Sequence, residues 1–327
     1  MQHDSRIYVA GHRGLVGSAI LRGLEQRGFR DLLLRTHAEL DLTDRAAVRA
    51  FFSSEKPEYV FLAAAKVGGI LANNAYPADF IRENLEIQTN VIDACYRSGV
   101  KRLLFLGSSC IYPKLAPQPI KEEYLLTGPL EPTNQAYALA KIAGIEMCWS
   151  YNRQHGTRYL AAMPTNMYGP GDNFDLQKSH VLPALIRKVA EAKQAGAREI
   201  VVWGTGTPRR EFLYSDDLAE ACIHLLSLPD DVYDGLIQQD QAPLINIGTG
   251  EDLTIRELAE LVARVLEHDC KLTFDASRPD GTPRKLLDVS RIKSLGWAPK
   301  TSLEDGIRLT YESARKELER AGRSSGD

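Results

Sequence analysis

The first 170 residues alternate short apolar runs with longer segments in which apolar residues recur every three or four positions. The periodic segments predict helices. The apolar runs predict strands at residues 6–10, 31–34, 59–62, 103–106 and 158–163. Strands that alternate with helices form a parallel sheet covered on both faces, so we expect a doubly wound, Rossmann-type α/β fold. Ligands of such folds bind at the carboxyl ends of the strands.

A glycine-rich turn follows the first predicted strand and opens the first predicted helix. Gly11, Gly14 and Gly17 have the spacing G-x-x-G-x-x-G. Such glycines allow a tight turn and a close approach to a pyrophosphate, which the helix N-terminus attracts. The alternative is a purely structural turn, but the position directly after an N-terminal strand favours a dinucleotide site. Ala63 and Ala64, after the third predicted strand, offer a second place where backbone can lie against the cofactor.

The end of the second predicted strand distinguishes between the two nicotinamide dinucleotides. An acidic residue there would bind the ribose 2′-hydroxyl of NAD, and a basic residue accommodates the 2′-phosphate of NADP. This chain has Arg35-Thr36-His37 at that point and Arg13 inside the glycine turn. NADP(H) is therefore the expected cofactor, the alternative being that both arginines are solvated surface charges.

The second half of the chain has a looser pattern, with short strands between loops and amphipathic helices over residues 254–268 and 302–318. We therefore expect a smaller C-terminal α/β lobe beside the first domain. The predicted organisation is an NADP-binding domain in residues 1–170, to which some later segments return, a mainly substrate-binding lobe in residues 171–321, and a disordered tail at residues 322–327.

Composition excludes several classes of function. The net charge of −3 contains no block of like charges, so neither nucleic acid nor a charged membrane surface is an expected partner. No apolar run approaches the ~20 residues that span a bilayer, and no signal peptide precedes the first strand. The five cysteines lack Cys-x-x-Cys spacing, which fits neither a disulfide framework nor a metal site. We expect a cytoplasmic protein without a bound metal.

Two pieces of a candidate active site lie near the middle of the chain. Ser108 follows the strand at 103–106, where its hydroxyl could donate to a carbonyl oxygen. Tyr137 and Lys141 are four residues apart on a predicted helix and share a face, so Lys141 would favour the phenolate form of Tyr137. A helix-surface pair is the alternative for an isolated Tyr-x-x-x-Lys. Cys110 is either an inert thiol or an acid/base group.

Basic pairs recur in the loops of the second half. Arg209-Arg210 and Arg284-Lys285 each follow a glycine-containing loop. Such cations favour an anionic substrate, for example a diphosphate, over an apolar one. Solvated surface charge is the alternative interpretation.

Taken together and in order, these motifs resemble the extended short-chain dehydrogenase/reductase superfamily of nucleotide-sugar enzymes. More specifically, five blocks of the chain are similar to the GDP-L-fucose synthases, a family within that superfamily. The resemblance spans almost the whole length. The five blocks are residues 10–17, 66–70, 107–113, 163–166 and 280–285.

The resemblance implies an enzyme that epimerises GDP-4-keto-6-deoxy-D-mannose at C3 and C5 and then reduces C4 with NADPH, giving GDP-L-fucose. Each inversion removes a proton from one face of a carbon and returns one to the other. The resemblance assigns Cys110 as base and His180 as acid, with ordinary pKa values of about 8.5 and about 6.5 that can be tuned to neutral pH. It further implies that Ser108 and Tyr137 polarise the C4 oxygen and that Lys141 also bonds the nicotinamide ribose.

Binding residues follow from the same resemblance, position by position. The implied substrate contacts are Lys188, Trp203, Arg210 and Lys285. The implied cofactor contacts are Gly11, Arg13, Gly14, Leu15, Val16, Gly17, Arg35, His37, Ala63, Ala64, Lys141, Pro164, Asn166, Met167 and His180. The family also implies a homodimer formed through the long helices at 77–98 and 137–151.

Two positions depart from the family pattern. His37 stands where a second arginine is expected for the 2′-phosphate, which weakens the case for a strong NADP preference. Lys188 stands where a substrate-binding arginine is expected. Lysine keeps the charge but lacks the bidentate fork of a guanidinium.

Other functions remain open at this point. A 4-epimerase or 4,6-dehydratase of the same fold would keep Tyr137 and Lys141 but recycle its cofactor. A 4-epimerase needs no proton transfer at C3 or C5, so Cys110 with His180 argues against it, and a dehydratase is expected to have Asp-Glu where this chain has Ser109-Cys110. A non-catalytic NADPH-binding sensor would tolerate the loss of active residues, all of which are present.

Overall fold

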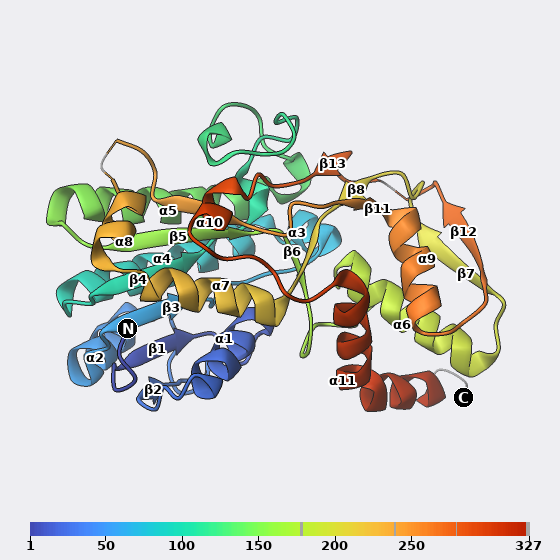
Figure 1. The fold of residues 1–327 in the computed structure, drawn as a ribbon, viewed down its shortest axis with the longest axis horizontal. Coiled ribbons are helices and arrows are strands. Elements are labelled where there is room, and N and C mark those ends of the chain that lie inside the picture. The colour runs from blue at the N-terminus through green and yellow to red at the C-terminus, as the bar shows by residue number, and fades with distance from the viewer. Residues whose placement is uncertain (177–178, 239, 279, 325–327) are drawn as a thin grey trace.

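A computed structural model describes residues 1–176, 179–238, 240–278 and 280–324 (Figure 1). Its largest element is a parallel sheet of six strands in the order β10-β5-β4-β3-β1-β2. The expected doubly wound sheet is therefore confirmed. Its strands are β1 (Ile7–Ala10), β2 (Leu32–Leu33), β3 (Tyr59–Leu62), β4 (Arg102–Leu106), β5 (Tyr159–Pro164) and β10 (Leu244–Ile247).

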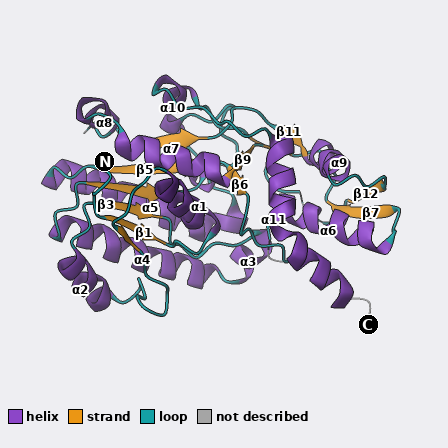
Figure 2. Ribbon diagram, turned by 60° about the horizontal axis from the view of Figure 1, so that its bottom comes forward, coloured by secondary structure: helices purple, strands orange, loops and turns teal. Residues whose placement is uncertain are grey.

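Helices cover both faces of this sheet, as Figure 2 shows. One face carries α1 (Leu15–Gln26) and α7 (Ser215–Ser227), which pack against each other. The other carries α2 (Arg45–Glu55), α4 (Pro77–Arg97) and α5 (Gln135–His155), packed in that order. Because both faces are covered, every residue of β1, β4 and β5 is buried, which explains why these strands are apolar apart from Arg102 at the start of β4.

A second hydrophobic core lies beside the first, on the right in Figure 1. It is built from three helices that pack on one another, α6 (Val181–Ala195), α9 (Ile255–Val265) and α11 (Leu303–Ser324), and from the strand pair β7 (Glu199–Trp203) and β12 (Lys271–Asp275), on which α6 packs. Exposed and buried residues alternate along β7 because only one face of this ribbon is covered.

Two small sheets connect the lobes. Strand β6 (Asn166–Tyr168) pairs with β9 (Phe212–Tyr214), and β8 (Arg209–Arg210) lies between β11 (Leu253–Thr254) and β13 (Arg284–Lys285). The remaining elements are the short helices α3 (Ile70–Ala75), α8 (Asp230–Leu236) and α10 (Ser290–Ser294) and the single 3-10 turns η1 (Ser109–Ile111), η2 (Glu122–Tyr124) and η3 (Pro132–Asn134).

The structure differs from the sequence-based expectation in several places. Helix α7 was not expected, although its residues that are not buried, Asp216, Glu220, His224 and Ser227, recur at helical spacing. Helix α11 continues to Ser324, so residues 322–324, expected in a disordered tail, are helical. Residues 325–327 lie outside the described residues. None of the helices in the described ranges is long and apolar enough to cross a bilayer.

Candidate active site

The turn between β1 and α1 leaves no room for side chains at two of its glycines. Gly11 has a φ of +86°, and a Cβ there would lie 2.7 Å from the backbone nitrogen of Ala64. A Cβ on Gly17 would lie 2.0 Å from the carbonyl oxygen of Gly11. The backbone of Ala63 donates to Ala10 at 3.1 Å and holds the alanines against the turn. The glycine and alanine segments therefore form one compact wall at the carboxyl edge of the sheet.

The N-terminus of α1 is open to an anion. Gly14 is its N-cap, and no side chain caps the helix there. Leu15, Val16 and Gly17 provide the N–H groups of the first turn, which have no partner within the helix. Free N–H groups and the helix dipole favour a phosphate at this position. The residues present thus fit the pyrophosphate of a dinucleotide.

Arg13 and Arg35 lie at the same end of the cofactor site but differ in their partners. Arg35 is bound to the carboxylate of Glu55 at 2.7 Å, and Arg13 is exposed on the glycine turn. Hydrogen bonds from Thr36 lower the pKa of Glu39, and the charges of Arg35 and Arg13 lower it further, which places both cations near that carboxylate. Arg13 is the more available of the two for a 2′-phosphate.

Four other expected cofactor contacts lie outside the glycine turn: His37, Pro164, Asn166 and Met167. The side chain of His37 is 84% exposed. Pro164 ends β5, and Asn166 and Met167 lie on β6, within a segment expected as a loop. The side chain of Asn166 donates to the carbonyl oxygen of Glu211 at 2.8 Å, so it holds β6 to the junction between the lobes.

The end of β4 and the first turns of α5 bring three expected catalytic side chains together. The Ser108 hydroxyl accepts a hydrogen bond from the backbone of Cys110 at 3.3 Å and also hydrogen bonds to Tyr137. The Lys141 ammonium is 5.8 Å from the centroid of the Tyr137 ring and donates to the carbonyl oxygen of Leu106 at 2.8 Å. The expected grouping of Ser108, Tyr137 and Lys141 is present.

Without cofactor, the pKa shifts of Tyr137 and Lys141 do not favour the phenolate that the sequence predicted. Burial raises the pKa of Tyr137, the neighbouring Cys110 raises it further, and the hydrogen bond from Ser108 offsets only part of the increase. Burial also lowers the pKa of Lys141 to about 7, so this side chain is only partly protonated at neutral pH. Tyr137 is therefore a neutral phenol, the form that can donate a proton.

Cys110 is a half-buried thiol in contact with a lysine from the other end of the chain. The ammonium of Lys285 lies 3.4 Å from its Sγ. Burial alone would raise the pKa of Cys110, but the charge of Lys285, the Ser108 hydroxyl and the charge of Arg210 outweigh burial and lower it. A lowered pKa increases the fraction of Cys110 that is thiolate at neutral pH, and the thiolate is the form that can act as base or nucleophile.

His180 is the N-cap of α6, as the sequence predicted for the start of this helix. Its side chain is accessible to solvent, yet the protein around the ring is dense enough to lower its pKa, and Lys285 lowers the pKa further. Lys285 is therefore close enough to influence both Cys110 and His180. The two candidate acid/base groups belong to one electrostatic environment.

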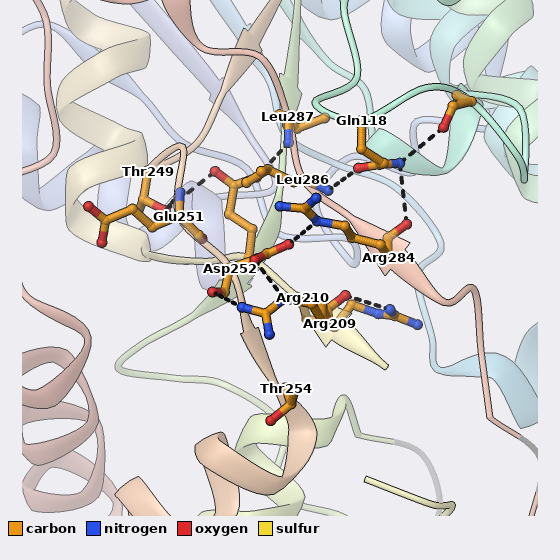
Figure 3. A network of polar contacts seen from close by, with 12 residues as sticks. Gln118, Arg209, Arg210, Thr249, Glu251, Asp252, Thr254, Arg284, Leu286 and Leu287 are labelled. Carbon is orange, nitrogen blue, oxygen red and sulfur yellow. Dashed lines mark hydrogen bonds and ion pairs between the residues drawn. The ribbon is translucent and has the colours of Figure 1, made fainter. Parts of the chain in front are cut away.

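The register of a short parallel strand pair explains why two cations face the thiol. Arg284 pairs with Arg209 and Lys285 pairs with Arg210. Side chains alternate along strands, so Arg210 and Lys285 share one face and the other two arginines share the opposite face. That opposite face is neutralised by Asp252, which binds Arg209 at 2.9 Å and Arg284 at 2.5 Å (Figure 3).

The two remaining expected substrate contacts are Lys188, further along α6, and Trp203, at the end of β7. Lys188 is 4.8 Å above the Trp203 ring and donates to a carbonyl oxygen of β7. Arg278, which the sequence did not single out, lies 5.0 Å from the same ring. Because Lys188 follows His180 by eight residues, the two positions are about 12 Å apart along the helix. A ligand that contacts both must be extended.

Glu211 is a buried carboxylate that the motifs did not indicate. It is fully buried and accepts hydrogen bonds from the backbone of Gly250 at 2.8 Å and of Leu287 at 3.0 Å. Burial raises its pKa, and these hydrogen bonds partly offset the increase. Glu211 thereby joins β9 to the segment that follows Lys285. A charged residue directly before the apolar run at 212–214 was the available signal.

Comparison with known proteins places this site in a family. The model of the NAD dependent epimerase/dehydratase family matches residues 7–247. GDP-L-fucose synthase 1 of Arabidopsis thaliana is 62% identical over 309 residues, which are 94% of this chain and 93% of the relative. GDP-L-fucose synthase of Escherichia coli (strain K12) is 57% identical over 309 residues, 94% of this chain and 95% of the relative.

A solved structure of a related enzyme has the same fold. MlghC, a GDP-mannoheptose C4 reductase from Campylobacter jejuni with NADP bound, is 43% identical and has a TM-score of 0.88. The similarity covers 96% of this chain and 99% of that chain. The resemblance seen in the motifs is confirmed, and the chain belongs to the NAD dependent epimerase/dehydratase family.

Proposed function

We propose that this chain converts GDP-4-keto-6-deoxy-D-mannose to GDP-L-fucose by epimerisation at C3 and C5 followed by NADPH-dependent reduction at C4. The observation that carries the proposal is the contact between Cys110 and Lys285 beside the Ser108, Tyr137 and Lys141 group. A simple ketone reductase needs no thiol with a lowered pKa. Relatives that are 57% and 62% identical carry the name GDP-L-fucose synthase.

Epimerisation uses the acidity of the C–H bonds beside the C4 ketone. The Cys110 thiolate accepts the proton from one face of the carbon, and the hydroxyls of Ser108 and Tyr137 stabilise the enolate oxygen that forms. Protonated His180 returns a proton to the opposite face, which inverts the carbon. Exchange with solvent then resets the thiol and the imidazole for the second carbon.

Reduction uses the other half of the same site. Bound NADPH supplies the hydride for C4. Tyr137, a neutral phenol, protonates the resulting alkoxide, and Ser108 keeps the oxygen in place. Lys141, anchored on β4, holds the start of α5 so that Tyr137 stays next to Ser108.

Substrate binding prepares His180 for its role. Burial and the charge of Lys285 lower the pKa of His180 in the free protein, so the neutral imidazole is favoured at pH 7. The negative charge of a diphosphate near Arg210 and Lys285 would oppose the effect of Lys285. The imidazolium needed for proton return then forms more readily in the complex.

We also propose a cytoplasmic homodimer. Helices α4 and α5 pack side by side on one face of the sheet and expose large apolar side chains, Tyr96 at 39% and Leu139 at 41%. Pairing with the same helices of a second copy would cover them. All five cysteines are free thiols, which suits a reducing compartment. Sedimentation equilibrium would give twice the mass of 36.3 kDa.

The activity is tested by incubating the protein with GDP-4-keto-6-deoxy-D-mannose and NADPH. We expect one NADPH consumed per sugar and a product with the fucose configuration in its NMR spectrum. The absence of net NADPH consumption would overturn the proposal. A reduced product that keeps its original C3 and C5 configuration would leave only the reductase half of the proposal.

A further inference from the structure

The backbone that carries Lys285 is held on two edges. On one edge it pairs with β8, where the backbone of Arg209 donates to the carbonyl oxygen of Pro283 at 2.8 Å. The opposite edge faces the segment that follows η1 in the first lobe. There, the backbone of Ile120 donates to the carbonyl oxygen of Leu286 at 2.7 Å. Lys285 thus lies on a strand between two chain segments.

On the same edge as Ile120, the side-chain amide of Gln118 makes the hydrogen bonds that a backbone peptide group of a neighbouring strand would make. The Oε1 of Gln118 accepts a hydrogen bond from the backbone of Leu286 at 2.9 Å. Its Nε2 donates to the carbonyl oxygen of Arg284 at 3.3 Å and to that of Ala116 at 3.3 Å (Figure 3). Two of these three partners, Arg284 and Leu286, are the neighbours of Lys285 in the chain. The amide therefore fixes the backbone on both sides of the lysine.

Gln118 and Cys110 belong to the same loop of the first lobe. They and Lys285 line one cavity of about 30 Å³, which is large enough for about one water molecule. One segment therefore presents the thiol and also holds the strand that brings the ammonium to it. We propose that Gln118 is a positioning residue, which keeps the Lys285 ammonium in contact with the Cys110 thiol.

The charges around the thiol show why this contact matters. Burial opposes ionisation of Cys110, and of the groups that favour it the charge of Lys285 is the strongest, ahead of the Ser108 hydroxyl and Arg210. Tyr137 on α5 interacts with the thiol as a neutral phenol. Lysine is a point charge on a flexible four-carbon stem, so the placement of its backbone decides how long the ammonium stays at the sulfur. Loosening the strand would weaken this stabilisation of the thiolate.

The catalytic meaning of this inference rests on the proposed role of Cys110 as base, but its test does not. The full-length protein, without substrate, is alkylated with iodoacetamide between pH 6 and 10, and modification of the Cys110 peptide is followed by mass spectrometry. In Gln118→Met, a nearly isosteric change that removes all three hydrogen bonds of the amide, the alkylation midpoint should rise by about 0.5 to 1 pH unit. The same substitution at exposed Gln26 should leave the midpoint unchanged.

A double-mutant comparison separates positioning from a general structural effect. Lys285→Met should raise the midpoint by more than Gln118→Met, and the double variant should match Lys285→Met alone. A parent-like midpoint in Gln118→Met, or a further rise on adding it to Lys285→Met, would overturn the proposal. If Gln118→Met does not fold, Gln118→Asn serves instead, because its shorter amide cannot reach both backbone groups. If the alkylation midpoint rises in Gln118→Met as expected but the parent protein shows no epimerase activity, only the proposed function is contradicted.

Discussion

The ammonium of Lys141 lies 2.8 Å from the carbonyl oxygen of Leu106, the last residue of β4. The lysine is 3% exposed and also lies 4.8 Å above the ring of Phe105. In the free protein the Lys141 ammonium therefore donates to the backbone of β4, and the hydroxyl of Tyr137 hydrogen bonds to Ser108. This anchor connects the protonation of Lys141 with the stability of the fold.

Lys141 should make the stability of the cofactor-free protein depend on pH. Burial lowers its pKa to about 7, and in the unfolded chain it titrates near its ordinary value. Between these values the unfolded chain binds more protons, so the free energy of unfolding should rise from pH 7 towards pH 10, by up to ~1.4 kcal/mol per pH unit. Below pH 7 this contribution is constant, because both states are protonated.

Urea denaturation at pH 7, 8 and 9 checks this expectation. Lys141→Met keeps the apolar stem and removes the titrating group, so its unfolding free energy should lack that part of the rise. If the parent and the variant change in parallel over this range, the lysine does not titrate as described.

Arg13 should contribute more than Arg35 to the preference for NADPH. Arg13→Ala removes an exposed cation, whereas Arg35 is already bound to Glu55. A charged hydrogen bond contributes ~1.5–3 kcal/mol, so kcat/KM for NADPH should fall roughly 10- to 150-fold in Arg13→Ala. The value for NADH should hardly change, because NADH has no 2′-phosphate.

Steady-state kinetics gives kcat/KM with NADPH and with NADH for the parent and for the variant. Exposed Arg30 on the same lobe gives a matched control, since Arg30→Ala removes one positive charge away from the glycine turn. Equal losses with NADPH and NADH in Arg13→Ala would contradict its assignment to the 2′-phosphate.

Cys110→Ser should separate the two halves of the reaction. A serine hydroxyl is a far weaker base than a thiolate, and a general base contributes about 10²- to 10⁴-fold. Incorporation of solvent deuterium at C3 and C5 should therefore slow by at least about 100-fold, while reduction of an already epimerised substrate should stay near the parent rate. NMR of the product and NADPH absorbance measure the two steps. Equal loss of both would remove Cys110 from the role of base.

Gly17→Ala should destabilise the cofactor lobe even without cofactor. The new Cβ would lie 2.0 Å from the carbonyl oxygen of Gly11, which is backbone and cannot turn away. Overpacking of this kind costs at least about 1–3 kcal/mol. Thermal unfolding followed by circular dichroism measures the loss. Gly235→Ala in α8, where a Cβ meets nothing within 4 Å, should be neutral or stabilising, and equal effects at the two sites would exclude this explanation.

The sequence predicted the parts whose signal is local. Strands buried on both faces read as apolar runs, and the glycine turn, Ser108 and the Tyr137–Lys141 pair are short motifs, so the cofactor sheet and the reductase group could be placed in advance. The state of Tyr137 could not, because it depends on how deeply α5 packs and on Cys110. A spacing of four residues says nothing about burial.

Long-range partners could not be predicted. Gln118 and Leu286 are 168 residues apart, and neither belongs to a recognisable motif. Glu211 is a single charge whose partners, the backbone groups of Gly250 and Leu287, carry no side-chain signal. Helix α7 has a readable helical pattern that the prediction overlooked, but its packing on α1 carries no local signal. Each of these features requires knowledge of which segments meet.

Strand β10 pairs with β5 at the edge of the cofactor sheet, and α7 covers α1. A ribosome that has made only the first 170 residues has released a sheet without its last strand and without one of its covering helices. The cofactor lobe therefore completes its fold only after residue 247 has emerged, when α9, β12 and α11 of the second core have not yet been synthesised. The lysine that contacts the thiol is made later still, so a nascent chain interrupted before residue 247 has neither a finished cofactor sheet nor Lys285 beside Cys110.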